Sequence, residues 1–163
     1  MTTNVTSPAV PSTSVRRILV PLDFSESSYK ALAYASALAR QFEAKITLLH
    51  VVQMTYMVGE YGAIELPELE VQLTTSARSK LESVAREKVP AGQVDGTLIR
   101  VGPAVPEIAN TAKETNADLL VISTHGYTGL KRIVLGSVAE NVVRHAPCPV
   151  LVVREKEHEF IHN

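Results

Sequence analysis

The sequence predicts an α/β protein with one doubly wound, Rossmann-like domain: a five-stranded parallel sheet in the strand order 3-2-1-4-5, with helices on both faces. Short apolar runs rich in β-branched residues alternate with segments of helical periodicity along the chain. The strongest apolar runs lack the polar/apolar alternation of a half-exposed strand, which is typical of parallel strands covered on both faces. The length of 163 residues suits one domain with its own core.

The first two strands are expected to flank the first helix. The run ILVPLDF, which follows Arg17, is short, apolar and closed by a proline and an acid. From Ser25 the spacing of apolar residues becomes helical, and Ser25 or Ser27 is suited to cap this helix at its amino end. The run KITLLHVV (45–52) indicates a second buried strand, and residues 53–66, which have no clear period, are expected to form a long loop.

The rest of the chain repeats this alternation. The expected elements are a helix from about Glu68 to Lys88, a strand over 96–101, a helix over 106–116, a strand over 118–123, a helix over 137–145 and a last strand over 149–153. Pro90, Gly92 and the Gly102-Pro103 pair mark the ends of elements, because glycine and proline interrupt regular structure.

The domain is expected to span residues 16–154. Residues 1–15, rich in Ser, Thr and Pro, predict a disordered leader, and residues 155–163 predict a charged C-terminal tail. Hydrophobic residues make up 45% and charged residues 20% of the chain, as in an ordinary globular protein. The formal net charge of −1 gives no support for a nucleic-acid partner.

The composition also bears on the compartment of the protein. Cys148 is the only cysteine, so no intramolecular disulfide can form and a reducing environment is favoured. No apolar run approaches the roughly 18–20 residues of a membrane span, and the first fifteen residues do not resemble a signal peptide. We therefore expect a cytoplasmic protein without a membrane partner.

The predicted ligand site is the crevice at the switch point of the sheet. In open α/β sheets, ligands bind beyond the carboxyl ends of the strands, where the direction of winding reverses. For the order 3-2-1-4-5 this point lies between the first and fourth strands. Pro21, Leu22 and Asp23 end the first strand, and the segment STHGYTG (123–129) follows the fourth. Both segments should therefore border the same crevice.

Asp23 admits two interpretations. The phosphate-binding patterns GxGxxG and GxxxxGK[ST] are absent, and a carboxylate at the end of the first strand would repel a phosphate. Asp23 is suited instead to accept hydrogen bonds from ribose hydroxyls or an exocyclic amine. The alternative is that Asp23 only helps to cap the first helix.

The segment after the fourth strand is better suited to an anion. Gly126 and Gly129 allow the backbone to approach a ligand closely. Gly136 and Ser137 open the next helix, whose free N–H groups and dipole attract phosphate. Ser137 and Glu140 also match the capping-box pattern S-x-x-E, so the serine can equally be read as a helix cap.

These segments resemble the nucleotide-binding branch of the universal stress protein family. The family pattern is G-x2-G-x9-G-[ST], and Gly126, nine further residues and Gly136-Ser137 match its second part. Three further segments are similar to the family: VPLDFSESSYKALAYA, LLHVV and THGYTGLKRIVLGSVAENVVRHAPCPVLVV. The resemblance therefore covers roughly residues 16–154. The first glycine of the pattern is replaced here by Ser123.

The resemblance implies a homodimeric regulatory module of the stress response that binds ATP, with Mg²⁺ or Mn²⁺ bound through the phosphates. Asp23 and Val51 would flank adenine and ribose, and the last strand, Pro149 to Val153, would pair with its mate. Gly126, Gly136, Ser137 and Val138 would bracket the phosphates. The alternatives are a slow ATP hydrolase and a protein-interaction module of the same fold without nucleotide. An enzyme is not expected beyond weak ATP hydrolysis.

The predicted nucleotide site consists of residues from both segments and from the second strand: Pro21, Leu22, Asp23, Val51, Ser123, His125, Gly126, Gly129, Gly136, Ser137 and Val138. His125 could contact a phosphate, although loop histidines more often bond locally. His50 and Cys148 are expected to be structural, and no histidine shows metal-ligand spacing with a cysteine pair.

Overall fold

The computed structural model describes residues 14–53, 58–59, 62–63, 67–124, 136–155 and 161. Within these ranges, five parallel strands form one sheet in the order β5-β2-β1-β6-β7. The strands are β1 (Arg17–Pro21), β2 (Lys45–Val52), β5 (Val94–Val101), β6 (Leu119–Ser123) and β7 (Val150–Val153). In chain order these are strands 3-2-1-4-5, and the predicted fold class is confirmed.

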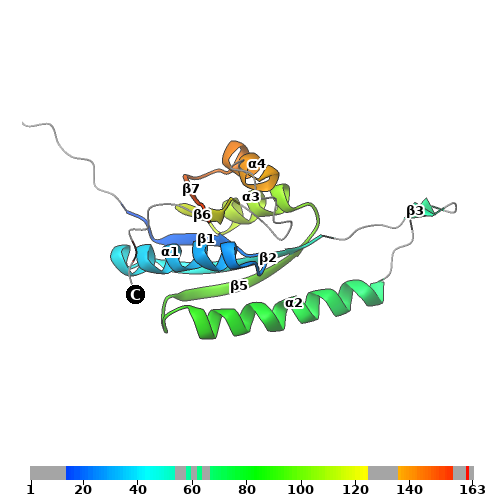
Figure 1. Ribbon diagram of the computed structural model, residues 1–163, viewed down its shortest axis with the longest axis horizontal. Helices are drawn as coiled ribbons and strands as arrows, with labels where there is room; N and C mark the ends of the chain where they lie inside the picture. Colours follow the sequence, from blue (N-terminus) through cyan, green and yellow to red (C-terminus); the bar gives the residue numbers. More distant parts are fainter. Residues whose placement is uncertain are drawn as a thin grey trace, which may run out of the picture.

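In the part of the chain that the structure describes, four helices cover the sheet: α1 (Glu26–Phe42), α2 (Pro67–Lys88), α3 (Ala104–Glu114) and α4 (Ser137–His145). In Figure 1, α2 runs along the β5 edge, whereas α3 and α4 lie together near β6 and β7. No helix in the described ranges is long and apolar enough to cross a bilayer.

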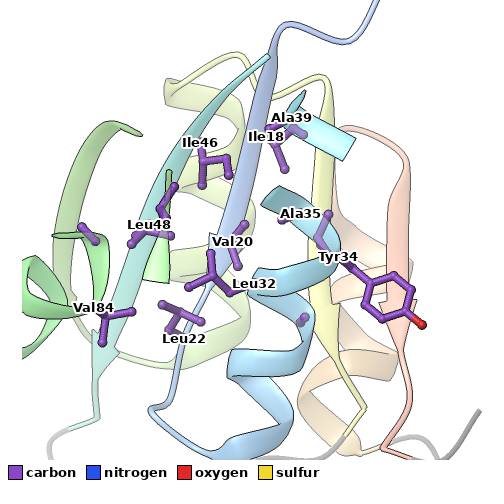
Figure 2. Close-up of a cluster of buried hydrophobic side chains, with 14 of the residues drawn as sticks. Ile18, Val20, Leu22, Leu32, Tyr34, Ala35, Ala39, Ile46, Leu48 and Val84 are labelled. Atoms are coloured by element: carbon purple, nitrogen blue, oxygen red, sulfur yellow. The ribbon is translucent and has the colours of Figure 1, made fainter. Parts of the chain in front are cut away.

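The sheet separates two hydrophobic cores. Residues of α1 and α2 pack with Ile18, Val20, Ile46 and Leu48 on one face, which we call the α1–α2 core and which Figure 2 shows in part. On the other face lies the α3–α4 core, formed by the following residues: Leu19, Leu49, Ile108, Ala112, Ala117, Leu120, Ile122, Ala139 and Val142. Neighbouring residues of β1 and β2 thus face opposite cores, as expected for strands buried on both faces.

Helix α1 follows the predicted pattern closely. Ser25 is its N-cap, and the Ser25 hydroxyl accepts a hydrogen bond from the Ser28 N–H at 3.2 Å. Glu43 ends the helix in the left-handed conformation (φ 54°), and the Ala44 N–H bonds back to Ala39 O at 2.9 Å. This tight exit leads directly into β2, so that α1 returns the chain to the amino end of the sheet.

Two expectations are corrected in detail. Within the region expected to be a long loop, β3 (Val58–Gly59) and β4 (Gly62–Ala63) form a short antiparallel pair, while 54–57, 60–61 and 64–66 lie outside the described residues. The third strand of the sheet, β5, begins at Val94 rather than residue 96, because Val94 extends the ladder by pairing with Ile46.

The segment that follows β7 contacts the domain at two described positions. Lys30 Nζ donates a hydrogen bond to Glu155 O at 3.0 Å, and Ile161 packs against the α1–α2 core. Both positions belong to the predicted charged tail. The charged composition of that tail does not predict the packing of Ile161 against the core.

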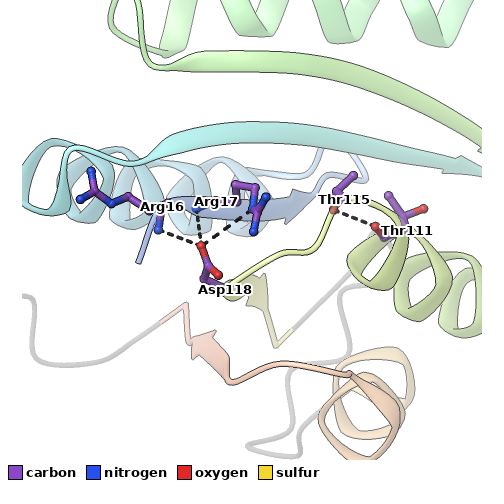
Figure 3. A network of polar contacts seen from close by, with 5 residues as sticks. All are labelled: Arg16, Arg17, Thr111, Thr115 and Asp118. Carbon is purple, nitrogen blue, oxygen red and sulfur yellow. Dashed lines mark hydrogen bonds and ion pairs between the residues drawn. The ribbon is translucent and has the colours of Figure 1, made fainter. Parts of the chain in front are cut away.

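Asp118 links the amino ends of β1 and β6. Its Oδ2 accepts hydrogen bonds from the backbone N–H groups of Arg16 and Arg17, each at 2.8 Å (Figure 3). The Asp118 N–H in turn donates to Arg17 O at 2.8 Å. The bond from Arg16, followed by the one from Arg17 and the Arg17 charge, lowers the pKa of Asp118 against the opposing effect of burial.

Replacing Asp118 should therefore weaken the junction of the two central strands. We expect Asp118→Asn to lower the free energy of unfolding at pH 7 by about 1 kcal/mol, because hydrogen bonds to a charged acceptor are the stronger ones. The contribution is present above the ordinary carboxyl pKa and is lost as the pH falls through the lowered folded value. Urea unfolding at neutral and acid pH measures both effects.

Asp95→Asn, at an exposed position of β5, is the matched control with the same change in charge. An equal loss of stability in both variants would show that net charge, and not the Asp118 bonds, is responsible.

Candidate functional site

A cavity of about 290 Å³ opens at the carboxyl ends of β1 and β6, where the winding of the sheet reverses. Its walls come from β1, β2, β6 and the first turns of α1, α3 and α4. The lining residues are Pro21, Leu22, Asp23, Ser28, Leu49, Val51, Gln53, Ala104, Ile108, Ile122, Ser123, Thr124, Gly136, Ser137, Val138 and Ala139. The position is the one that the strand order predicts for a ligand site.

The cavity brings together eight of the eleven residues predicted from sequence: Pro21, Leu22, Asp23, Val51, Ser123, Gly136, Ser137 and Val138. The other three, His125, Gly126 and Gly129, lie outside the described residues. Segments about a hundred residues apart in the chain therefore meet at one cavity. Their role in binding a nucleotide stays a prediction.

Asp23 takes part in the entry to α1. Its Oδ1 accepts hydrogen bonds from the Ser25 N–H at 3.0 Å and from the Ser25 hydroxyl at 2.5 Å. Both bonds hold Ser25, the N-cap of the helix, so the capping interpretation of Asp23 has support in the structure. Both bonds go to Oδ1. The same carboxylate therefore holds the N-cap residue of α1 and lines the cavity, where a carboxylate can accept further hydrogen bonds.

The residue after Asp23 has an unusual backbone. Phe24 has a φ of 65°, in the left-handed region that costs a residue other than glycine about 1–2 kcal/mol. The Phe24 ring stacks on the imidazole of His50 with centroids 4.4 Å apart and an interplanar angle of 28°. Lys80 Nζ lies 4.5 Å from the centre of the same ring. These contacts stabilise a turn that would otherwise be strained.

His50 is half-buried. Its Nδ1 lies 2.7 Å from Leu22 O, which assigns the proton to Nδ1 as donor. Burial lowers the pKa of His50; the Leu22 bond and then the Asp23 charge oppose this effect, and the Lys80 charge adds the smallest contribution, which lowers the pKa. The expectation of a structural His50 is consistent with this environment.

The start of α4 is determined by a close backbone contact. The Gly136 N–H donates to Thr124 O at 2.9 Å, and a Cβ placed on Gly136 would lie only 2.4 Å from that oxygen. A side chain at this position would therefore push α4 away from the end of β6. Glycine is needed here for packing, whether or not a ligand binds.

The capping-box interpretation of Ser137 is wrong. The N-cap of α4 is Gly136, with no side-chain cap hydrogen bond, and Ser137 is the first residue of the helix. Because the close approach to Thr124 places the cap at the glycine, the serine lies one position too late to cap. Ser137, Val138 and Ala139, in the first turn of α4, line the cavity.

Ser123, which replaces the first glycine of the family pattern, lies at the end of β6. It pairs with Val153, and Val121 pairs with Leu151; Val121, Leu151 and Val153 all pack with the α1–α2 core. By the alternation of a strand, the Ser123 side chain belongs to that face of the sheet. Its neighbour Ile122 belongs to the α3–α4 core, on the cavity side. The Cβ of Ser123 is thus assigned to the face away from α4.

The predicted site residues leave out half of the lining: Ser28, Leu49, Gln53, Ala104, Ile108, Ile122, Thr124 and Ala139. Of these, only Thr124 belongs to a segment that was expected to border the crevice. One signal was available for Ala104 and Ile108, because the Gly102-Pro103 break ends the strand next to β2 and opens α3 at the same edge of the sheet. Cys148, as expected, packs with the α3–α4 core, and burial raises the pKa of its thiol.

The arrangement combines three kinds of contact. Leu49, Val51 and Ile108 offer apolar surface to a flat ring, Asp23 offers a hydrogen-bond acceptor, and the first turn of α4 offers backbone donors and a positive dipole. In the described ranges, no group of three or more His, Cys, Asp and Glu side chains is placed to hold a metal ion. The cavity is therefore suited to a small molecule that carries an aromatic ring, hydroxyl groups and an anion.

Fold and cavity together define a class: doubly wound α/β proteins with a ligand-sized cavity at the switch point of the sheet. Within this class, the model of the universal stress protein family matches residues 14–154. The chain belongs to the universal stress protein family.

Relatives in Methanocaldococcus jannaschii support this assignment. Universal stress protein MJ0531 is 37% identical over 147 residues, which cover 88% of this chain and 85% of the relative. Universal stress protein MJ0577 is 33% identical over 159 residues, covering 89% of this chain and 98% of the relative. The solved structure of MJ0577 matches with a TM-score of 0.74 at 34% identity over 90% of this chain and 100% of that chain.

A second similar structure contains a ligand. It is that of a universal stress protein in complex with cAMP, with a TM-score of 0.55 and 26% identity over 86% of this chain and 98% of that chain.

The contact between Gly136 and Thr124 leads to a prediction on stability. Gly136→Ala should lower the free energy of unfolding by about 1–3 kcal/mol, because the methyl group can be accommodated only if α4 or the end of β6 moves. Gly96→Ala is the matched control, since a Cβ there meets nothing within 4 Å. Thermal and urea unfolding compare the two variants; equal effects would mean that the close contact does not constrain α4.

Proposed function

We propose that this chain binds an adenine nucleotide, with ATP as the ligand, in the cavity between β1 and β6, and acts as a regulatory module of the stress response. The observation that carries the proposal is the meeting of Asp23 with the amino end of α4 at one cavity. A carboxylate and a helix amino terminus suit opposite ends of a nucleotide, because the first accepts hydrogen bonds and the second attracts anions.

The adenosine part is assigned to the side of Asp23 and Val51. Leu49 and Val51 supply apolar surface for the base, while Asp23 accepts hydrogen bonds from ribose hydroxyls or the exocyclic amine. The universal stress protein solved with cAMP supports an adenine nucleotide as the class of ligand. The choice of ATP follows from the resemblance of Gly126 and Gly136-Ser137 to the pattern of the nucleotide-binding branch.

The phosphates are assigned to the first turn of α4, from Gly136 to Val138. Free N–H groups in that turn, the Ser137 hydroxyl and the helix dipole all favour negative charge. Gly126 and Gly129 are proposed to complete this end of the site. A Mg²⁺ or Mn²⁺ ion is assigned to the phosphates of ATP themselves, as the family resemblance implies.

The proposal predicts that ATP with Mg²⁺ stabilises the protein. At a hundredfold excess over the dissociation constant, binding contributes about 2.7 kcal/mol, which corresponds to a rise in melting temperature of roughly 5–10 °C. Ser137→Glu should remove this rise, because its carboxylate repels the phosphates. The substitution should not unfold the protein, since an acid in the first turn favours the helix.

Ser137→Gln is the matched control, with the same size and no charge, and should retain most of the rise. The comparison is made by differential scanning fluorimetry at a series of ATP concentrations. No rise in the wild-type protein at millimolar ATP would contradict the proposed function. An equal rise in the Glu variant would contradict the assignment of the phosphates.

Mass spectrometry of the supernatant after denaturation of purified protein distinguishes the alternatives. Release of an adenine nucleotide supports the proposal, and its absence favours the interaction module without nucleotide. Incubation with ATP over hours then separates a binding protein, which leaves ATP intact, from a slow hydrolase.

We also propose a homodimer formed through the last strand, Pro149 to Val153. Among the described residues, strand β7 ends the sheet and pairs only with β6, which leaves its other edge to a second copy of the chain. The carbonyl groups of Pro149 and Val153 accept hydrogen bonds from the N–H of Leu120 in β6 and of Thr124 just after it. By the alternation of a parallel ladder, Val150 and Val152 direct their backbone groups to the open edge.

This dimer predicts a distinct effect of proline at Val150. Val150→Pro removes a backbone donor from the open edge and is tolerated at the first residue of an edge strand, so we expect a monomer that remains folded. Val150→Ala keeps the donor and should remain dimeric. Sedimentation equilibrium measures the mass of each protein. The proposal would be contradicted if both variants were dimers, or if the wild-type chain sedimented as a monomer of 17.7 kDa.

A further inference from the structure

His50 and Phe24 lie next to the candidate nucleotide site without lining it. Leu49 and Val51, on either side of His50 in β2, both line the cavity. Because side chains alternate along a strand, His50 points to the opposite face of the sheet, and Phe24 packs there against the α1–α2 core. A bound nucleotide would therefore not contact either ring. Any effect on binding must pass through the backbone between them.

One imidazole holds both neighbours of Asp23. On one side of Asp23, His50 Nδ1 donates to Leu22 O at 2.7 Å. On the other side, the His50 ring stacks on the Phe24 ring at 4.4 Å. The Leu22 N–H also bonds to Leu49 O at 2.8 Å, which extends the pairing of β1 with β2 by one residue up to Asp23. Asp23 thus lies between two residues that His50 contacts directly.

The backbone at Phe24 is unfavourable by itself. Its φ of 65° belongs to a region that glycine adopts freely and phenylalanine does not. Such a conformation persists only where surrounding contacts determine it, and conformations of this kind cluster at ligand sites. In this turn the ring contacts come from β2 through His50 and from α2 through Lys80, at 4.5 Å. The left-handed turn directs the chain from β1 into α1 immediately after the Asp23 carboxylate.

We propose that His50 and Phe24 are positioning residues that set the affinity of the nucleotide site by holding Asp23 in its binding orientation. The inference rests on the proposed nucleotide-binding function. His50 holds the backbone on both sides of Asp23, through the Leu22 carbonyl and the Phe24 ring. Ser25 holds Oδ1 itself, so the carboxylate is already oriented before a ligand arrives. Orientation in advance raises affinity because less freedom is lost on binding. The simpler alternative is that the two rings only pack together at the end of the sheet.

Three variants separate positioning from packing. His50→Ala removes both the bond to Leu22 and the stacked ring. His50→Phe keeps an aromatic ring of similar shape against Phe24 but removes the bond. Phe24→Gly removes the ring and relieves the unfavourable φ, so its melting temperature should change little. The packing control is Val84→Ala, in α2, which truncates a buried side chain of the same core away from the cavity.

Isothermal titration of the full chain with ATP and Mg²⁺, at a temperature where every variant is folded, measures affinity. We expect His50→Ala and Phe24→Gly to bind about tenfold more weakly and His50→Phe to be intermediate. Val84→Ala should bind as the wild-type chain does, although it melts at a lower temperature. A loss of affinity in Phe24→Gly without a loss of stability is the result that packing alone does not produce.

A second measurement needs no ligand. Backbone couplings in NMR spectra of the ligand-free protein report the φ of Phe24. In His50→Ala we expect the left-handed φ to be lost or averaged, whereas in Val84→Ala it should be retained. A left-handed Phe24 in the His50→Ala variant would overturn the inference, because another contact would then hold the turn.

The outcomes also separate this inference from the proposed function. If the wild-type chain binds ATP and the His50 and Phe24 variants bind it equally well, the inference fails and the proposed function stands. If affinity falls in proportion to stability in all variants, Val84→Ala included, packing explains the result and the inference fails. If the wild-type chain binds no adenine nucleotide, both fail together.

Discussion

The parallel pairing of β1 with β6 is the constraint on which the rest of the structure depends. The two strands are neighbours, with Ile18 opposite Leu119 and Leu19 opposite Leu120, although a hundred residues separate them in the chain. From β1 the sheet grows in one direction to β2 and β5, and in the other to β6 and β7. The connections after β1 and β6 consequently diverge, and the cavity lies between them.

Two local arrangements shape the sides of that cavity, and each depends on a close contact. On the β6 side, a glycine brings α4 so near to Thr124 O that the helix begins at the strand end. On the β1 side, a left-handed phenylalanine turns the chain into α1 with Asp23 at the corner. Gly136 allows the close approach of α4 without strain. Phe24, in contrast, is strained in its left-handed conformation unless contacts hold its ring.

Asp23 and Ser137 were each interpreted from the sequence either as part of a helix cap or as a ligand contact. For Asp23 the sequence left a ligand contact and a helix cap as alternatives; in the structure its Oδ1 holds the N-cap residue Ser25, and Asp23 also lines the cavity. For Ser137 the cap was the simpler interpretation, and it is excluded because Gly136 occupies the cap position. A one-residue shift of a helix start thus reversed the interpretation of a serine, and sequence patterns do not resolve helix ends so finely.

By itself, the sequence determined the strand order, the presence of helices on both faces of the sheet, and most of the cavity residues that follow the first and fourth strands. Apolar runs, helical periodicity and chain-order rules are local signals, and they were sufficient for these features. Only the tertiary structure decided that Ala104 and Ile108 border the cavity, that Gly136 touches Thr124, and that His50 stacks on Phe24. Each of these is a contact between elements distant in the chain, whose geometry depends on how helices and strands pack and leaves no periodic trace in the sequence.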